Sequence, residues 1–78
     1  MSDAMSTQVI WQEILHERER QIAQWGGVQH DDRNGPNDWI AFICYHSAKG
    51  SYKGDFRKQM IRVAALAVAA IEWFDRRK

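Results

Sequence analysis

The stretch VAALAVAAI, residues 63–71, places the strongest constraint on the fold of this 78-residue chain. It is apolar on every side of a helix, so the middle of that helix should be covered by protein all round. Its nine residues are too few to span a bilayer. Two other helices of so short a chain can hardly cover it fully, and its alanines let a further helix approach closely. We therefore expect a second subunit to form the remaining wall, in at least a dimer.

Two more helices are predicted before this one. Helical periodicity runs from about residue 7 to 25 and puts an apolar stripe on one face, which Arg18 interrupts with its guanidinium reaching outward. The stripe consists of Trp11, Leu15, Ile22 and Trp25, flanked by Ile10 and Ile14. A Gly- and Asp-rich loop, GGVQHDDRNGPND, separates it from a second helix that Asn37 can cap and that ends near Gly50.

The third helix follows the short connector GSYKGD, with Asp55 as its cap, and runs to about residue 77. No segment has the alternating pattern of a strand. We expect an all-α protein, a three-helix antiparallel bundle completed by homo-oligomerisation. Residues 1–6 would be a flexible N-terminus and residues 7–78 a single helical domain.

Charge and cysteine content argue against several classes of partner. The net charge is +1, from 11 basic and 10 acidic residues, which favours neither nucleic acid nor an anionic membrane. The single Cys44 rules out an internal disulfide framework, and we expect it to be buried and structural. The N-terminus has no apolar signal sequence. These features are typical of a cytoplasmic protein.

The loop holds the most polar cluster of the chain, QHDD at residues 29–32. These side chains suit a divalent cation or a polar ligand at the mouth of a helical pocket, although Asx-turns of the loop explain them more simply. A weak metal alternative consists of His30, Asp31 and Asp32. The histidines show no spacing typical of zinc. Glu72 and Asp75 lie on one helical face, and we expect them to pair with basic residues.

Several segments, read in order, resemble one known family. They are an R-Q-x-x-x-W-G segment from Arg20 to Gly26, the pair Gln29-His30, Trp39 ten residues after Gln29, and V-A-A-x-A-V-A from Val63. From about residue 17 to 77 the chain thereby resembles the small MazG-like proteins that are common in phages and prophages. Those proteins belong to the all-α nucleoside triphosphate pyrophosphohydrolases, which release pyrophosphate and a nucleoside monophosphate.

The resemblance also implies where a metal site would lie. In the family, Mg²⁺ is held by a helical E-E-x-x-E and by an E-x-x-D from the next helix, since several carboxylates must converge on a hard cation. Laid on this chain, the three glutamates fall on Tyr45, His46 and Lys49, and the acidic positions of the next helix fall near Gln59 and Arg62. Lys and Arg repel Mg²⁺. We therefore expect no catalytic residues and no cofactor.

Three functions remain open. The one that we favour is a pseudoenzyme, a non-catalytic MazG-like protein that binds a nucleotide or a similar ligand, with cationic side chains in place of the metal. The first alternative is a pyrophosphohydrolase that requires Mg²⁺ at a rearranged site, drawn from Glu13, Glu17, His30, Asp31, Asp32, Glu72 and Asp75. The second alternative is a helical interaction module that binds a host protein.

The candidate residues follow from these interpretations. Three of the four tryptophans, Trp11, Trp25 and Trp39, should form core or pocket wall. The candidate ligand-binding residues are Trp25, Gln29, His30, Asp31, Asp32, Trp39, His46, Lys49 and Arg62. The candidate interface residues lie on the third helix and are Val63, Leu66, Ala67, Ala70, Trp73 and Phe74.

Overall fold

Three helices make up the backbone of the computed structural model, which describes residues 3–27, 33–52 and 55–77. They are α1 (Asp3–Trp25), α3 (Pro36–Tyr52) and α4 (Phe56–Arg76). No strand occurs within those ranges. The expected all-α class is confirmed. The first helix begins at Asp3, earlier than the sequence pattern indicated, and the second continues to Tyr52 rather than ending near Gly50.

Local backbone chemistry sets the ends of the helices. Gly26 has a φ of 102°, a left-handed conformation that only glycine adopts without strain, and its N–H donates to the Ile22 carbonyl at 2.9 Å. At the start of α3 the cap is Gly35 rather than the expected Asn37, because the Gly35 carbonyl accepts from the Asp38 N–H at 3.0 Å. The Asp38 carboxylate accepts in return from the Gly35 N–H at 2.8 Å. Asp55 is the N-cap of α4, as expected, but its side chain makes no capping hydrogen bond.

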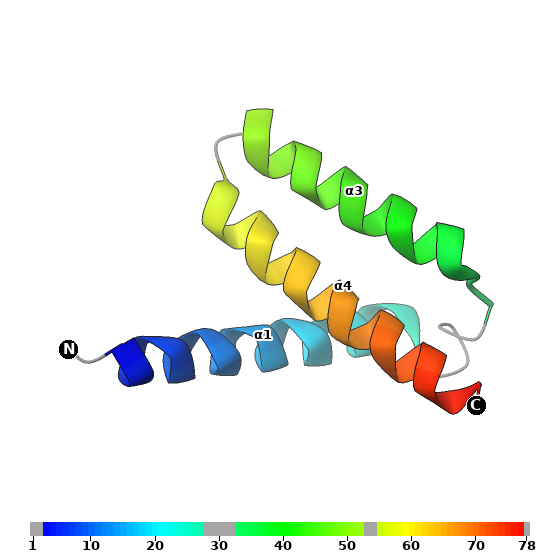
Figure 1. Cartoon of the computed structure of the whole chain (residues 1–78), viewed down its shortest axis with the longest axis horizontal. Coiled ribbons are helices and arrows are strands. Elements are labelled where there is room, and N and C mark those ends of the chain that lie inside the picture. The colour runs from blue at the N-terminus through cyan, green and yellow to red at the C-terminus, as the bar shows by residue number, and fades with distance from the viewer. Residues whose placement is uncertain (1–2, 28–32, 53–54, 78) are drawn as a thin grey trace.

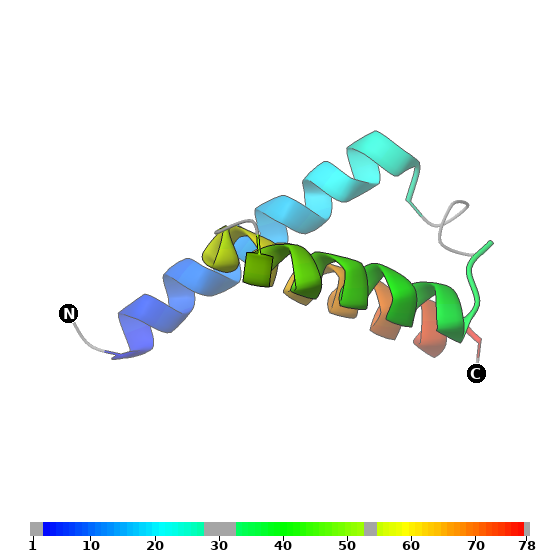
Figure 2. The ribbon, with the colours of Figure 1, turned by 90° about the horizontal axis from the view of Figure 1, so that it is seen from above.

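The helices form one antiparallel pair and one crossing. Figure 1 shows α3 and α4 running side by side in opposite directions, while α1 runs in the same general sense as α4 and crosses it obliquely. The view from above shows the N-terminal half of α1 extending away from the other two helices (Figure 2). Helix α4 packs against both neighbours. The arrangement therefore differs from the expected antiparallel bundle in the direction and angle of α1.

The core lies between α3 and α4. Trp39 packs against Leu66, Ala69 and Trp73, and all four side chains are buried. The rings of Trp39 and Trp73 are 6.4 Å apart, centre to centre. Because Ala69 is small and fully covered, the Trp39 indole can lie close to the backbone of α4. The alanine-rich sequence of α4 thus makes room for a tryptophan from α3.

The face of α1 that packs inward is not the apolar stripe. The buried residues of α1 are Ile14, Arg18 and Gln21. The Arg18 Nε donates to Glu72 Oε1 of α4 at 3.0 Å, so the guanidinium reaches inward to a carboxylate rather than outward to solvent. The stripe residue Trp11 is 62% exposed, and its expected core role is wrong. The expected pairing of Glu72 with a basic residue is confirmed.

Apolar character is also left uncovered on α4. Val68 and Ile71 are exposed, so the two neighbouring helices do not cover VAALAVAAI all round. Within the described ranges, no helix is both long enough and apolar enough to cross a membrane.

The close approach of α3 to α4 at Gly50 generates a prediction. A Cβ added to this buried glycine would lie 3.2 Å from the Cβ of Gln59 and 3.5 Å from the Cα of Phe56. We expect Gly50→Val to lower the free energy of unfolding by about 1–3 kcal/mol, because the added methyl groups push the helices apart. Urea denaturation followed by circular dichroism measures the change.

The matched control is Ala48→Val, since Ala48 is exposed on the same helix. It adds a β-branched side chain without crowding α4. The free energy of unfolding should therefore fall only by the difference in helix propensity between Ala and Val, under about 1 kcal/mol. Equal costs for the two variants would show that Gly50 is not a contact point between the helices.

Candidate functional site

The main candidate site is a cleft of about 320 Å³ where the C-terminal half of α1 meets α3 and α4. We name it the aromatic cleft. Its walls are mostly apolar and aromatic, and among the described residues that line it Arg18 is the one charged side chain and none is a carboxylate. The lining residues are Arg18, Gln21, Trp25, Gly27, Asn34, Trp39, Phe42, Tyr45, His46, Leu66 and Ala69. An enclosed apolar wall with few polar groups is typical of sites for small organic ligands.

Helical spacing brings these side chains together. On α1, Arg18, Gln21 and Trp25 recur at intervals of three and four residues and so share one face. On α3, Phe42 and His46 are four residues apart and share another. Leu66 and Ala69 of α4 form the floor between them. The ring of Phe42 meets that of Trp39 edge to face, with centroids 6.3 Å apart, which fixes one aromatic wall.

Among the residues that the structure describes, three polar atoms of the cleft lining have no hydrogen-bond partner. They are the amide oxygen Gln21 Oε1, the amide nitrogen Asn34 Nδ2 and the indole nitrogen Trp39 Nε1. Gln21 is 3% exposed and Trp39 is 4% exposed. A buried polar atom without a partner costs about 1–3 kcal/mol, so such atoms mark places where a ligand or an ordered water completes the hydrogen bonding. Together they offer one acceptor and two donors.

Four of the positions that the family resemblance assigns to metal ligands, Tyr45, His46, Lys49 and Gln59, are linked by contacts. His46 Nδ1 and Gln59 Oε1 are 3.1 Å apart, across the contact between α3 and α4. Tyr45 stacks edge to face on His46, and the Lys49 ammonium lies 5.2 Å from the Tyr45 ring centre. An imidazole, an amide and an ammonium occupy this region, a set that supplies hydrogen bonds and positive charge but no carboxylate for Mg²⁺.

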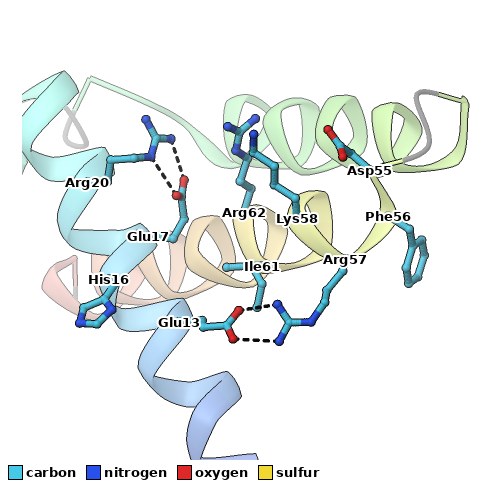
Figure 3. Close-up of a pocket in the computed structure, with 10 residues that line it drawn as sticks. All are labelled: Glu13, His16, Glu17, Arg20, Asp55, Phe56, Arg57, Lys58, Ile61 and Arg62. Carbon is cyan, nitrogen blue, oxygen red and sulfur yellow. Dashed lines mark hydrogen bonds and ion pairs between the residues drawn. The ribbon is translucent and has the colours of Figure 1, made fainter.

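A second, wider cleft of about 610 Å³ lies between α1 and the start of α4, and we name it the charged cleft (Figure 3). The described residues of its walls carry four cations and three carboxylates. The lining residues are Glu13, His16, Glu17, Arg20, Asp55, Phe56, Arg57, Lys58, Ile61 and Arg62. Figure 3 shows Glu13 facing Arg57 of α4 and Glu17 facing Arg20 of its own helix.

The two clefts adjoin through Gln21 and Glu17. Gln21 Nε2 donates to Glu17 Oε2 at 3.1 Å, and Arg20 donates to both oxygens of that carboxylate at 2.8 and 2.7 Å. These hydrogen bonds, first of all those from Arg20, hold the pKa of Glu17 below its ordinary value. The bidentate contact with Arg57 lowers the pKa of Glu13 in the same way.

The candidate ligand-binding residues divide between these places. Trp25, Trp39 and His46 line the aromatic cleft together, Arg62 lines the charged cleft, and Lys49 lies beside Tyr45 at the cleft wall. The remaining candidates, Gln29, His30, Asp31 and Asp32, lie outside the described residues. The placement of the loop cluster QHDD relative to the cleft therefore stays a prediction.

The candidate interface residues of α4 fall into three groups. Leu66 and Trp73 are buried within the chain, so little of either side chain is left for a partner subunit. Phe74 is 60% exposed and available. Half-buried residues make up the third group, Val63, Ala67 and Ala70.

Some site residues were not among the candidates. Gln21 belongs to the R-Q-x-x-x-W-G segment and stands four residues before Trp25, so its position on the cleft face was readable from helical spacing. Asn34 had no such signal, because a loop residue is placed by tertiary structure. Cys44, expected to be buried, is exposed.

Within the described ranges, no group of three or more His, Cys, Asp or Glu side chains is arranged to hold a metal ion. Comparison with models of protein families, with curated proteins and with solved structures finds no match to this chain.

The ion pairs of the charged cleft predict acid sensitivity. Because the folded-state pKa of Glu17 lies below the 4.5 of the free side chain, the stabilising contribution is complete above about pH 4.5 and is lost as the pH falls through the folded-state pKa. We expect the melting temperature to decrease as the pH is lowered from 4.5, and to decrease less steeply in Glu17→Gln. Thermal unfolding across an acid pH series measures this.

Glu19→Gln is the matched control, since Glu19 is an exposed residue of the same helix and makes no contact in the charged cleft. The same flattening in both variants would contradict the role of the Glu17–Arg20 pair.

Proposed function

We propose that this protein is a non-catalytic member of the MazG-like proteins, of phage or prophage type, which binds a nucleotide or a similar ligand in the aromatic cleft. The observation that carries the proposal is one cleft whose lining combines aromatic walls with three residues that each have an unpartnered buried polar atom. A planar heteroaromatic ring matches both features, because its faces stack on aromatic side chains and its edge carries donors and acceptors.

Charge at the edge of the cleft supports a phosphorylated ligand. Lys49 lies one turn after Tyr45 and His46 on α3, and its ammonium is 5.2 Å from the ring centre of Tyr45, which lines the cleft. An ammonium binds a phosphate oxygen directly, without a bridging metal. We therefore place the ring of the ligand between the aromatic walls and its anionic part toward Lys49.

The residues present do not fit the Mg²⁺ that the family resemblance implies. A hard cation needs several oxygen ligands, whereas the five matched positions carry Tyr45, His46, Lys49, Gln59 and Arg62. Gln59 is moreover buried and in contact with His46. No hydrolytic step is therefore derived for this site.

For a rearranged catalytic site, the three glutamates of the candidate set are already engaged by arginines. Glu13 contacts Arg57, Glu17 contacts Arg20 and Glu72 contacts Arg18. An enzyme built from them would first have to break these pairs. No observation favours that alternative over binding.

The proposal predicts a melting shift that needs no metal. We expect a nucleotide at about 100 times its dissociation constant to add roughly 2.7 kcal/mol of apparent stability, without Mg²⁺. Thermal unfolding with a panel of nucleoside triphosphates, monophosphates and nucleosides, with and without Mg²⁺, measures this. Phe42→Ala should weaken binding about 5- to 150-fold, because it removes one aromatic wall.

Phe56→Ala is the matched control, since Phe56 is an exposed phenylalanine outside the aromatic cleft. Equal losses in the two variants would argue against the cleft as the site. A shift that requires Mg²⁺, together with release of pyrophosphate, would favour the enzyme instead. The absence of a shift with every member of the panel would refute nucleotide binding.

A further inference from the structure

The side-chain amide of Gln21 has two different ends, and its surroundings determine which of them is left for a ligand. An amide nitrogen donates hydrogen bonds, whereas an amide oxygen accepts them. Gln21 is 3% exposed and lines the aromatic cleft. Its Nε2 donates to Glu17 Oε2 at 3.1 Å, whereas its Oε1 has no hydrogen-bond partner among the described residues. The end that is left over is therefore the acceptor.

The partner of this amide can bind only one of its ends. An ionised carboxylate has acceptors and no donor, so Glu17 can accept from Nε2 but cannot donate to Oε1. If the amide turned over, two oxygen atoms would face each other with no hydrogen between them. The contact of Gln59 Oε1 with His46 Nδ1 is different, because an imidazole nitrogen can either donate or accept. The direction of the Gln21 amide is thus fixed by the chemistry of Glu17.

Arginine keeps the Glu17 carboxylate ionised and in place. Arg20 donates to both of its oxygens, at 2.8 and 2.7 Å. These hydrogen bonds, first of all, lower the pKa of Glu17, and the positive charge of Arg62 on α4 acts in the same direction. The Glu17 side chain is 13% exposed, so water has little access to compete for the contact. At neutral pH the carboxylate is therefore a fixed acceptor for Gln21.

Glu17 and Gln21 are neighbours on α1 but belong to different clefts. They are four residues apart, so their side chains lie one turn from each other on the helix. Of the residues that the structure describes, Gln21 lines the aromatic cleft, while Glu17 and Arg20 line the charged cleft (Figure 3). A ligand in the aromatic cleft would meet Gln21, and Glu17 would act on that ligand through the Gln21 amide.

We propose that Glu17 is a positioning residue, which fixes the Gln21 amide with its oxygen left for the ligand. The aromatic cleft then takes rings that bring an N–H or amino donor to this point. A ring that presents an acceptor there would leave the Gln21 oxygen without a partner and is disfavoured. The role of Glu17 in recognition rests on the ligand binding proposed above, whereas the direction of the amide does not.

Two pairs of nucleotides provide the probes, uridine with cytidine monophosphate and inosine with adenosine monophosphate. Within each pair, a ring carbonyl and an N–H are replaced by an amino group and a bare ring nitrogen, so donors and acceptors change places. An amide of fixed direction has to prefer one member. We expect the wild type to bind one member at least about fivefold more tightly, since a mismatched buried polar atom costs that factor or more. Isothermal titration calorimetry measures both dissociation constants.

Glu17→Gln should bring the ratio of the two dissociation constants close to one, because an amide at residue 17 both donates and accepts and lets Gln21 turn over. The matched control is Glu13→Gln, which removes the other carboxylate–arginine pair of the charged cleft. It should keep the wild-type ratio. An unchanged ratio in Glu17→Gln, an equal loss in both variants, or a wild type that binds the two members of each pair equally would overturn the proposal.

A second measurement needs no ligand. Nuclear magnetic resonance of the full chain gives the exchange rate with water of the Gln21 side-chain amide protons, which are identified by their absence in Gln21→Met. We expect slow exchange in the wild type and in Glu13→Ala, and at least about fivefold faster exchange in Glu17→Ala, which removes the acceptor. An unchanged rate in Glu17→Ala would refute the positioning role. The expected rates together with no binding of any nucleotide would instead refute the proposed function, and recognition of a ring donor with it.

Discussion

Helix α4 packs against both other helices, and the rest of the structure depends on this constraint. Two of its buried residues, Ala65 and Ala69, are small and almost fully covered, so α3 can bring the Trp39 indole close to its backbone. Gly50 of α3 makes the same close approach possible at the other end of the pair. Helix α1 packs against α4 as well and crosses it, and the aromatic cleft lies where the three helices meet.

An ion pair between a buried arginine of α1 and a half-exposed glutamate of α4 joins these two helices. The Arg18 side chain is 11% exposed and that of its partner Glu72 is 51% exposed. A pair on the surface contributes about 0–1 kcal/mol, and removing one partner of a fully buried pair costs about 3–5 kcal/mol. Because water screens Glu72, this pair lies between those limits. The pair joins the inward face of α1 to α4.

That same pair explains where sequence reasoning succeeded and where it failed. Breaks at Gly26 and Asp55 and the periodicity between them locate three helices, because these signals are local. Local sequence signals do not determine which face of α1 packs inward. Hydrophobicity alone favours Trp11 and Leu15 as the inward-facing residues, whereas the structure buries Arg18 and Gln21. The partner of Arg18 on α4, Glu72, lies 54 residues away in the sequence. Trp25, Trp39 and His46 were predicted as ligand-binding residues because the family resemblance marks them, and they do share one cleft.

The cost of unpartnered polar atoms bears on what such a cleft can accept. Domains are stable by only about 5–15 kcal/mol, and each buried donor or acceptor without a partner costs about 1–3 kcal/mol. Three of them in one cleft are therefore a large fraction of the stability of a 78-residue chain. An apolar ring of the right shape would leave that cost in place, whereas a ring whose edge accepts from Trp39 and Asn34 and donates to Gln21 removes it. A ligand of the proposed kind would therefore be selected by its hydrogen-bonding pattern at least as strongly as by its shape, because stacking is open to any aromatic ring and these three hydrogen bonds are not.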